Sequence, residues 1–146
     1  MAQHKRQGTA GSGSSTSAKA GSVVPRRDWT YRTIRNGVAA TEVRELEKAR
    51  IVERDDVRMI IPDRTLERRI SAHEPLKTEE ADGIARLLRV VHHARDVFDD
   101  DALADQWLRL PNPVLNNEVP IRMAATDLGA REVEAVLTRI EHGVFS

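Results

Sequence analysis

The arginines of segment 62–71 are the side chains of this sequence best suited to binding chemistry. Arg64, Arg68 and Arg69 recur at helical spacing, so a single helix would carry them on neighbouring faces. A guanidinium donates hydrogen bonds in a rigid fork, which fits phosphate oxygens and the guanine edge in the major groove. Thr65, close to the start of that helix, could contact a phosphate or a thymine methyl group. These four residues are our candidate DNA contacts.

Two short helices joined by a tight turn would position these arginines. The run "RDDVRMII" predicts one helix, and Pro62 stops it because the residue before a proline avoids the α region. Asp63 is expected to be the N-cap of the next helix, which runs from Arg64 to about Ala72. This outline is that of a helix-turn-helix, and we expect a DNA-binding region over 28–74. The alternative is a solvated amphipathic helix whose arginines pair with neighbouring glutamates.

The chain has 146 residues and a net charge of zero, but its charges are distributed unevenly. Residues 1–69 hold 15 Lys and Arg against 9 Asp and Glu, whereas residues 70–146 hold 8 against 14. A basic first half favours contact with phosphates, and an acidic second half favours another kind of partner. Much of the basic excess lies in residues 1–27, a segment rich in Gly, Ser and Ala that we expect to be a disordered tail.

The remaining segments have the periodicity of helices. A long helix beginning near Thr78 would bury one apolar stripe. The members of this stripe are Ile84, Leu87, Leu88, Val91, Ala94 and Phe98. A shorter helix, capped by Asp99–Asp101, starts near Ala102. The side chains it would bury are Leu103, Trp107 and Leu110. The last helix starts near Asp127 and ends at Gly143. No segment resembles a strand, so the sequence predicts an all-α fold.

The sequence lacks the local patterns of common enzyme classes, such as a P-loop, GxGxxG, a nucleophile elbow or HExxH. We therefore expect a protein without catalytic residues or a cofactor. His92 and Asp96 share a helix face, but two ligands do not complete a zinc site, and we expect no metal. The absence of cysteine and of long apolar runs favours a cytoplasmic protein without membrane contact.

The end of the chain places Val144 and Phe145 directly after the glycine that is expected to stop the last helix. A solvated terminus rarely benefits from exposed Val and Phe side chains. This end could insert into a partner, fold back onto its own helix, or fray.

Three stretches from residue 62 onward match one family in their order and spacing. They are "PDRTLERR" (62–69), "PLKTEEADGIARLLRVVHHARDVFDD" (75–100) and "ALADQWLRLPNPVLNNEVPIRMAATDLGAREVEAVLTRIEHGVFS" (102–146). Their most specific elements are the helical RTLxRR, the WLxxPNPxL turn, the T-x-x-GA-x-x-V segment and the terminal RIEHG. Together these stretches resemble the antitoxins of RES–Xre toxin–antitoxin systems, the MbcA/ParS/Xre group.

The resemblance implies an Xre-like helix-turn-helix part followed by a small helical toxin-binding domain over 75–146. It implies that the chain sequesters a RES-domain toxin, which degrades NAD or uses it to ADP-ribosylate a target. The C-terminal end of the antitoxin would lie at the NAD pocket of the toxin. The complex would also bind operator DNA and repress its own operon.

The resemblance also implies which residues meet the toxin. The expected toxin contacts are Asn112, Pro113, Arg139, His142, Gly143, Val144 and Phe145. Because helix-turn-helix proteins usually bind DNA as two-fold pairs, we expect a homodimer within a toxin–antitoxin hetero-oligomer. The alternative function is a stand-alone helix-turn-helix transcriptional regulator with no toxin partner.

Overall fold

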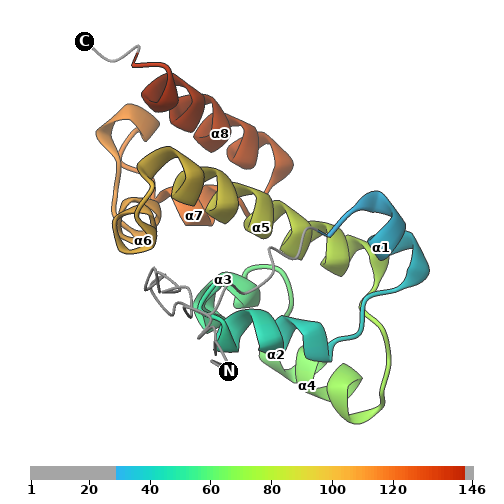
Figure 1. The fold of residues 1–146 in the computed structure, drawn as a ribbon. Coiled ribbons are helices and arrows are strands. Elements are labelled where there is room, and N and C mark those ends of the chain that lie inside the picture. The colour runs from blue at the N-terminus through green and yellow to red at the C-terminus, as the bar shows by residue number, and fades with distance from the viewer. Residues whose placement is uncertain (1–28, 144–146) are drawn as a thin grey trace, which may run out of the picture.

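The computed structural model describes residues 29–143, and within that range the chain forms helices and no strand (Figure 1). The all-α prediction is confirmed. The elements are α1 (Tyr31–Asn36), α2 (Thr41–Lys48), α3 (Arg54–Arg58), α4 (Asp63–Ser71), α5 (Thr78–Phe98), α6 (Asp101–Arg109), the 3-10 helix η1 (Pro113–Leu115), α7 (Pro120–Met123) and α8 (Asp127–Glu141). The tail predicted over 1–27, together with Val144 and Phe145, lies outside the described residues.

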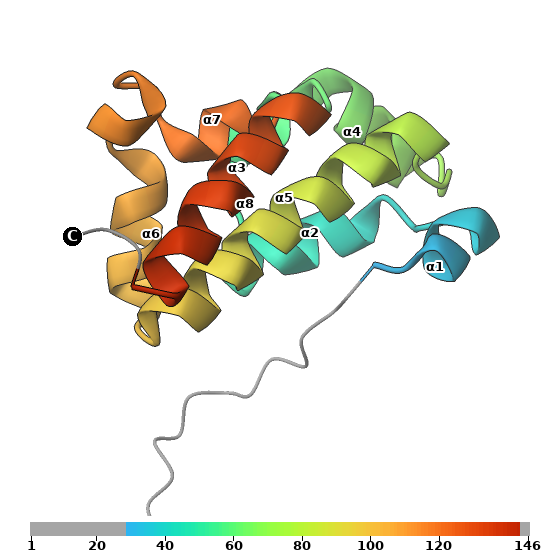
Figure 2. The ribbon, with the colours of Figure 1, turned by 90° about the horizontal axis from the view of Figure 1, so that it is seen from above.

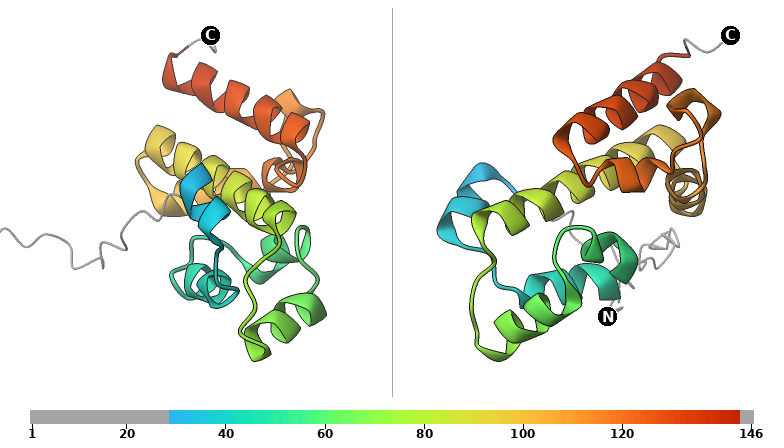
Figure 3. Two further views of the ribbon diagram at one scale, coloured as in Figure 1. Left: turned by 90° about the vertical axis from the view of Figure 1, so that its right-hand side faces the viewer. Right: turned by 180° about the vertical axis from the view of Figure 1, so that it is seen from behind.

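Helix α5 is the centre of the arrangement, with α8 along one side and α2, α3 and α4 on the other (Figures 1 and 3). Helices α5 and α8 run in the same direction. Arg89 Nε lies 2.7 Å from Glu134 Oε1, and His93 Nε2 lies 3.9 Å from Glu141 Oε2 further along both helices. Helix α6 packs by the C-terminal end of α5, and α1 lies near its N-terminal end (Figure 2).

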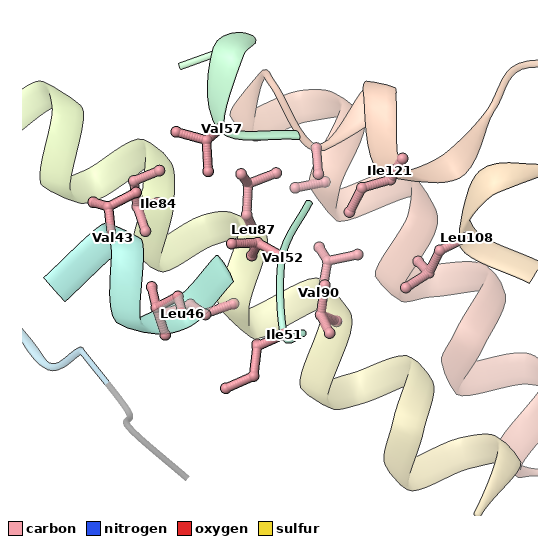
Figure 4. Close-up of a cluster of buried hydrophobic side chains, with 14 of the residues drawn as sticks. Val43, Leu46, Ile51, Val52, Val57, Ile84, Leu87, Val90, Leu108 and Ile121 are labelled. Carbon is pink, nitrogen blue, oxygen red and sulfur yellow. The ribbon is translucent and has the colours of Figure 1, made fainter. Parts of the chain in front are cut away.

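The hydrophobic core surrounds α5, because side chains from the helices on both of its sides pack against it. Val43 and Leu46 of α2 pack toward Ile84 and Leu87 of α5, and each of the four is at most 1% exposed (Figure 4). Burying each such side chain stabilises the fold by about 1.5–3 kcal/mol. Buried side chains from before and after residue 75 form one continuous cluster, so the two predicted parts share a hydrophobic core.

The apolar stripe predicted for α5 is confirmed as far as Ala94, and Phe98 is only partly buried. Val90 is fully buried as well, although the stripe did not include it. A single stripe describes a helix with one buried face. Because α5 is covered from both sides, its buried arc is wider than the stripe.

The face that α6 buries is not the predicted one. Ala104 and Leu108 are fully buried, whereas Leu103 and Leu110 are 47% and 52% exposed. Trp107 is partly buried, and its ring centroid lies 5.7 Å from that of Phe98. Ala104 and Leu108 lie four positions apart on one face of α6, and this face packs inward while Leu103 and Leu110 remain outside.

The predicted N-cap of α4 is shifted by one residue, because Pro62 and not Asp63 occupies that position. The N-cap of α5 is Lys77. The Lys77 backbone N–H donates to Glu80 Oε1 at 3.1 Å, which satisfies one of the free donors at that helix end. The expectation for α6 is confirmed, because Asp100 Oδ1 accepts a hydrogen bond from the Leu103 N–H at 3.0 Å.

A close backbone approach fixes the start of α8. Thr126 is its N-cap, and the Thr126 hydroxyl accepts a hydrogen bond from the Gly129 N–H at 3.0 Å. A Cβ atom on Gly129 would lie only 2.0 Å from the carbonyl oxygen of Met123. The T-x-x-G part of the sequence pattern is thus explained: threonine caps the helix, and glycine leaves room for the backbone of α7.

Candidate partner-binding surfaces

Helix α4 presents two of the predicted DNA-binding arginines to solvent. Arg64 is exposed, and the side chain of Arg68 is 61% exposed with a contact of 3.7 Å to Glu74. Thr65 is half-buried in the first turn of the helix. Buried Leu66 attaches the opposite side of α4 to the core. The exposed guanidinium groups can therefore donate to phosphates or base edges without repacking the helix.

Arg69 does not lie on this exposed face, contrary to the prediction. Its side chain is only 8% exposed and faces α5, where its Nε donates to Glu80 Oε2 at 3.1 Å and its Nη2 lies 2.9 Å from Glu80 Oε1. Glu74 Oε2 also contacts this arginine, at 3.4 Å from Arg69 Nη1. The spacing of the arginines placed Arg69 on a helix face adjacent to Arg68, but that face packs against α5. Arg69 therefore joins α4 to α5, and its guanidinium is largely buried between them.

An ion pair ties α3 to α4 across their connecting turn. Arg58 Nε donates to Asp63 Oδ2 at 2.8 Å, and Arg58 Nη1 donates to Asp55 Oδ1. The hydrogen bond that Arg58 donates to Asp63 raises the pKa of Arg58 above its ordinary value. Asp63 thus restrains the turn between the two helices, rather than capping α4 as predicted.

The predicted toxin contacts come from two elements that touch each other. Helix η1 contacts α8, and Leu115 of η1 is buried. Pro113 is exposed, as are Arg139, His142 and Gly143 at the end of α8. The η1 loop and the C-terminal end of α8 both lie on the side of the molecule where α6 is (Figure 1), and α6 extends from one toward the other (Figure 2). We call the residues Asn112, Pro113, Arg139, His142 and Gly143 the loop–α8 surface.

Asn112 shapes this surface through its own turn. Its Oδ1 accepts from the Val114 N–H at 2.9 Å, and its backbone N–H donates to the Glu118 carbonyl at 3.0 Å. The next two asparagines, Asn116 and Asn117, have φ angles of 56° and 63°, in the left-handed region that asparagine tolerates better than most residues. The side-chain amide oxygen of Asn112 is therefore engaged within the loop, and the residue holds η1 in place.

An ion-pair network that the sequence did not predict joins α3 to α6. Asp56 is buried, with its side chain 5% exposed, and its Oδ2 accepts from Arg109 Nη2 at 2.7 Å. Arg109 also lies 3.2 Å from Glu53, and its neighbour Asp105 accepts from Arg95 at 3.1 Å. Residues 56 and 109 are too far apart in the sequence for any local pattern to pair them. The network fixes the two predicted parts of the chain relative to each other.

A groove of about 660 Å³ lies between α1, α5 and α8, away from all the predicted site residues. Its lining includes Trp29, Tyr31 and Ile34 as well as the Arg89–Glu134 ion pair. Trp29 and Tyr31 lie two positions apart in a chain with only 3% aromatic residues, and this pattern could have indicated the groove from the sequence.

Comparison with known proteins relates these surfaces to a family. Residues 93–143 match the family model for the antitoxin Xre/MbcA/ParS C-terminal toxin-binding domain. Antitoxin Xre from Pseudomonas putida is 34% identical over 116 residues, which cover 77% of this chain and 71% of that protein. This chain belongs to the Xre/MbcA/ParS antitoxin family. The resemblance stated from the three sequence stretches is confirmed.

Other relatives of this antitoxin agree with the assignment. Antitoxin Xre from Photorhabdus laumondii is 33% identical over 116 residues, covering 77% of this chain and 78% of that protein. A protein named Prs ADP-ribosylating antitoxin, from Sphingobium, is 25% identical over 124 residues, with coverage of 77% and 78%. The family thus includes at least one relative whose name refers to ADP-ribosylation.

The family match includes the loop–α8 surface of this antitoxin. Residues 93–143 contain the end of α5, all of α6, η1, α7 and α8. Over residues 29–143, no helix is both long and apolar enough to span a bilayer. The same part of the chain contains no group of three or more His, Cys, Asp or Glu side chains placed to hold a metal ion.

Proposed function

We propose that this antitoxin binds and blocks a RES-domain toxin, one that degrades NAD or uses it to ADP-ribosylate a target. The loop–α8 surface and the chain end beyond it would make the contact, with Val144 and Phe145 reaching the NAD pocket of the toxin. The antitoxin itself would catalyse nothing and would act by covering the active site of its partner. We also propose that α3 and α4 form a helix-turn-helix that represses the operon.

The observation that carries the toxin proposal is the match of residues 93–143 to a toxin-binding domain. The exposure of Arg139, His142 and Gly143 supports it, because these side chains and the chain end after them are accessible to a partner. The RES identity rests on the resemblance of the terminal RIEHG and WLxxPNPxL elements to the RES–Xre antitoxins. The name of the Sphingobium relative is in keeping with NAD-linked chemistry.

Removing Val144–Ser146 is expected to restore toxicity when the shortened antitoxin is expressed together with a RES-domain toxin. The deletion would remove the apolar end that fills the pocket while leaving every helix of residues 29–143 intact. Growth and intracellular NAD, or ADP-ribose on target proteins, would be measured on induction. An antitoxin lacking residues 2–24 is the control and is expected to neutralise fully. Full neutralisation by the variant without Val144–Ser146 would contradict the pocket-filling role.

The DNA-binding proposal rests on the exposed arginines of α4. Arg64 and Arg68 lie on the solvent side, and Thr65 lies in the first turn, where recognition helices contact base edges. A homodimer would place two such helices about 34 Å apart, one turn of DNA. Arg69 is left out of the proposed contacts, because it is buried against Glu80.

Arg68→Ala is expected to weaken binding to the upstream DNA by about 1–3 kcal/mol if the side chain reads a base. If Arg68 contacts only phosphate, the loss would be similar on all sequences, and the salt dependence of binding would decrease by about one counterion. Fluorescence anisotropy at several salt concentrations separates the two. Arg131→Ala on α8, another exposed arginine at 72%, is the matched control. Unchanged affinity for Arg68→Ala would argue against α4 as the recognition helix.

A further inference from the structure

An apolar strip runs along the outer face of α6 and continues into η1. It consists of Leu103 and Trp107 of α6, Leu110 directly after that helix, and Val114 of η1. Leu103, Leu110 and Val114 are 47%, 52% and 54% exposed, and Trp107 is partly buried against Phe98. Leu103, Trp107 and Leu110 are the side chains that the sequence predicted to be buried, and of the three only Trp107 is partly covered by residues 29–143.

Such a strip is unusual for a surface that meets only water. A single exposed leucine needs no explanation, but adjacent large apolar side chains on a folded protein typically mark an interaction surface. Tryptophan is among the residues that contribute most to binding energy at protein interfaces. Ala104 and Leu108 attach α6 to the core, and of the strip only Trp107 also packs against it, so Leu103, Leu110 and Val114 remain accessible to a partner.

The position of the strip favours one occupant. It ends in Val114 of η1, next to Pro113 of the loop–α8 surface, and η1 contacts α8. All four residues of the strip lie within 93–143, the part of the chain that matches the toxin-binding domain. A partner seated on the loop–α8 surface would therefore extend over the strip without crossing a gap in the fold.

We propose that the apolar strip is a second contact area for the toxin, in addition to the loop–α8 surface; this rests on the proposed toxin-binding function. The charges next to the strip indicate the chemistry of the partner. Asp101 at the start of α6 is 73% exposed, and Asp99 and Asp100 beside it are also exposed. The matching face of the toxin would thus carry an aliphatic or aromatic patch with cationic side chains at the end facing these aspartates.

The test introduces a charge into the strip of the full-length antitoxin. Leu103→Asp and Leu110→Asp are each expected to weaken binding to the RES-domain toxin at least about tenfold, because a desolvated apolar contact is replaced by a buried charge. Leu128→Asp at the other end of α8, where the leucine is 76% exposed, is the matched control and is expected to bind like the wild type. Calorimetry gives the affinities, and thermal unfolding reports whether each variant is folded.

Should a charge within α6 unfold the chain, Val114→Asp in η1 tests the same strip outside a long helix. Wild-type affinity in these folded variants would overturn the proposal, while the toxin-binding function would remain. Loss of antitoxin self-association with unchanged toxin affinity, measured by light scattering, would also overturn it and assign the strip to a second copy of the chain. If the wild type itself did not bind the toxin, the proposed function would fail together with the strip.

Discussion

Arg69→Met is expected to lower the free energy of unfolding by about 3 kcal/mol, although the residue belongs to the arginine cluster that suggested DNA binding. The substitution keeps an unbranched apolar stem of similar length, so the change is mainly the loss of the guanidinium. Glu80, whose side chain is only 13% exposed, would then keep its negative charge without the ion-pair partner that contacts both of its oxygens. An uncompensated buried charge is costly, and α4 would lose its attachment to the start of α5.

Urea-induced unfolding followed by circular dichroism measures this effect. Arg68→Met is the matched control, one position earlier in the same helix, and is expected to change stability by less than about 0.5 kcal/mol because its side chain is exposed. The double variant Arg69→Met, Glu80→Leu is expected to regain much of the loss, since an apolar pair can replace a buried ion pair. If Arg69→Met were as stable as the wild type yet failed to bind DNA, Arg69 would be a DNA contact after all.

Gly129→Ala is expected to destabilise the protein by at least about 2 kcal/mol, even though alanine favours helices over glycine by about 1 kcal/mol. The added methyl carbon would lie 2.0 Å from the Met123 carbonyl oxygen and 2.9 Å from the Thr126 hydroxyl that caps α8. The Met123 oxygen accepts from the Thr126 N–H at 3.2 Å, so it cannot withdraw without breaking the turn. Helix α8 would have to shift, and its C-terminal end with it.

Gly83→Ala is the control for this prediction, since it places the same methyl group in another helix. There the new carbon would meet Ile60 Cγ2 at 2.4 Å, a side-chain atom that can move more readily than a backbone carbonyl. We expect a smaller loss of stability than for Gly129→Ala, measured by thermal unfolding. Equal losses in the two variants would indicate that α7 can yield, and that glycine at 129 is not required by the backbone approach.

The helices of the fold were largely predictable from the helical periodicity of apolar residues and from the residues that begin or end helices. The stripe of α5, the Asp100 cap of α6 and the end of α8 before Gly143 all follow from short patterns in the chain. These signals are local: a cap concerns residues three apart, and a stripe concerns successive turns of one helix. Family membership could be predicted in the same way, because the motifs that carry it are contiguous.

The predictions were wrong for side chains whose exposure depends on contacts with residues that are distant in the sequence. Arg69 and Arg68 are equivalent as sequence, yet one is buried on Glu80 and the other is exposed. Leu103 and Leu110 are more apolar than Ala104, yet Ala104 is the one that packs inward. In each case the exposure of the side chain depends on which other helix packs against that face. The periodicity of a single helix does not specify this.

The sequence by itself determined an all-α chain, the order and approximate bounds of its helices, and its relation to the Xre/MbcA/ParS antitoxins. Only the tertiary structure decided which side chains each helix leaves for partners. Helix formation is governed by residues a few positions apart, so it can be read along the chain. Exposure is governed by packing between segments such as α3 and α6, which meet through Asp56 and Arg109 and are far apart in sequence.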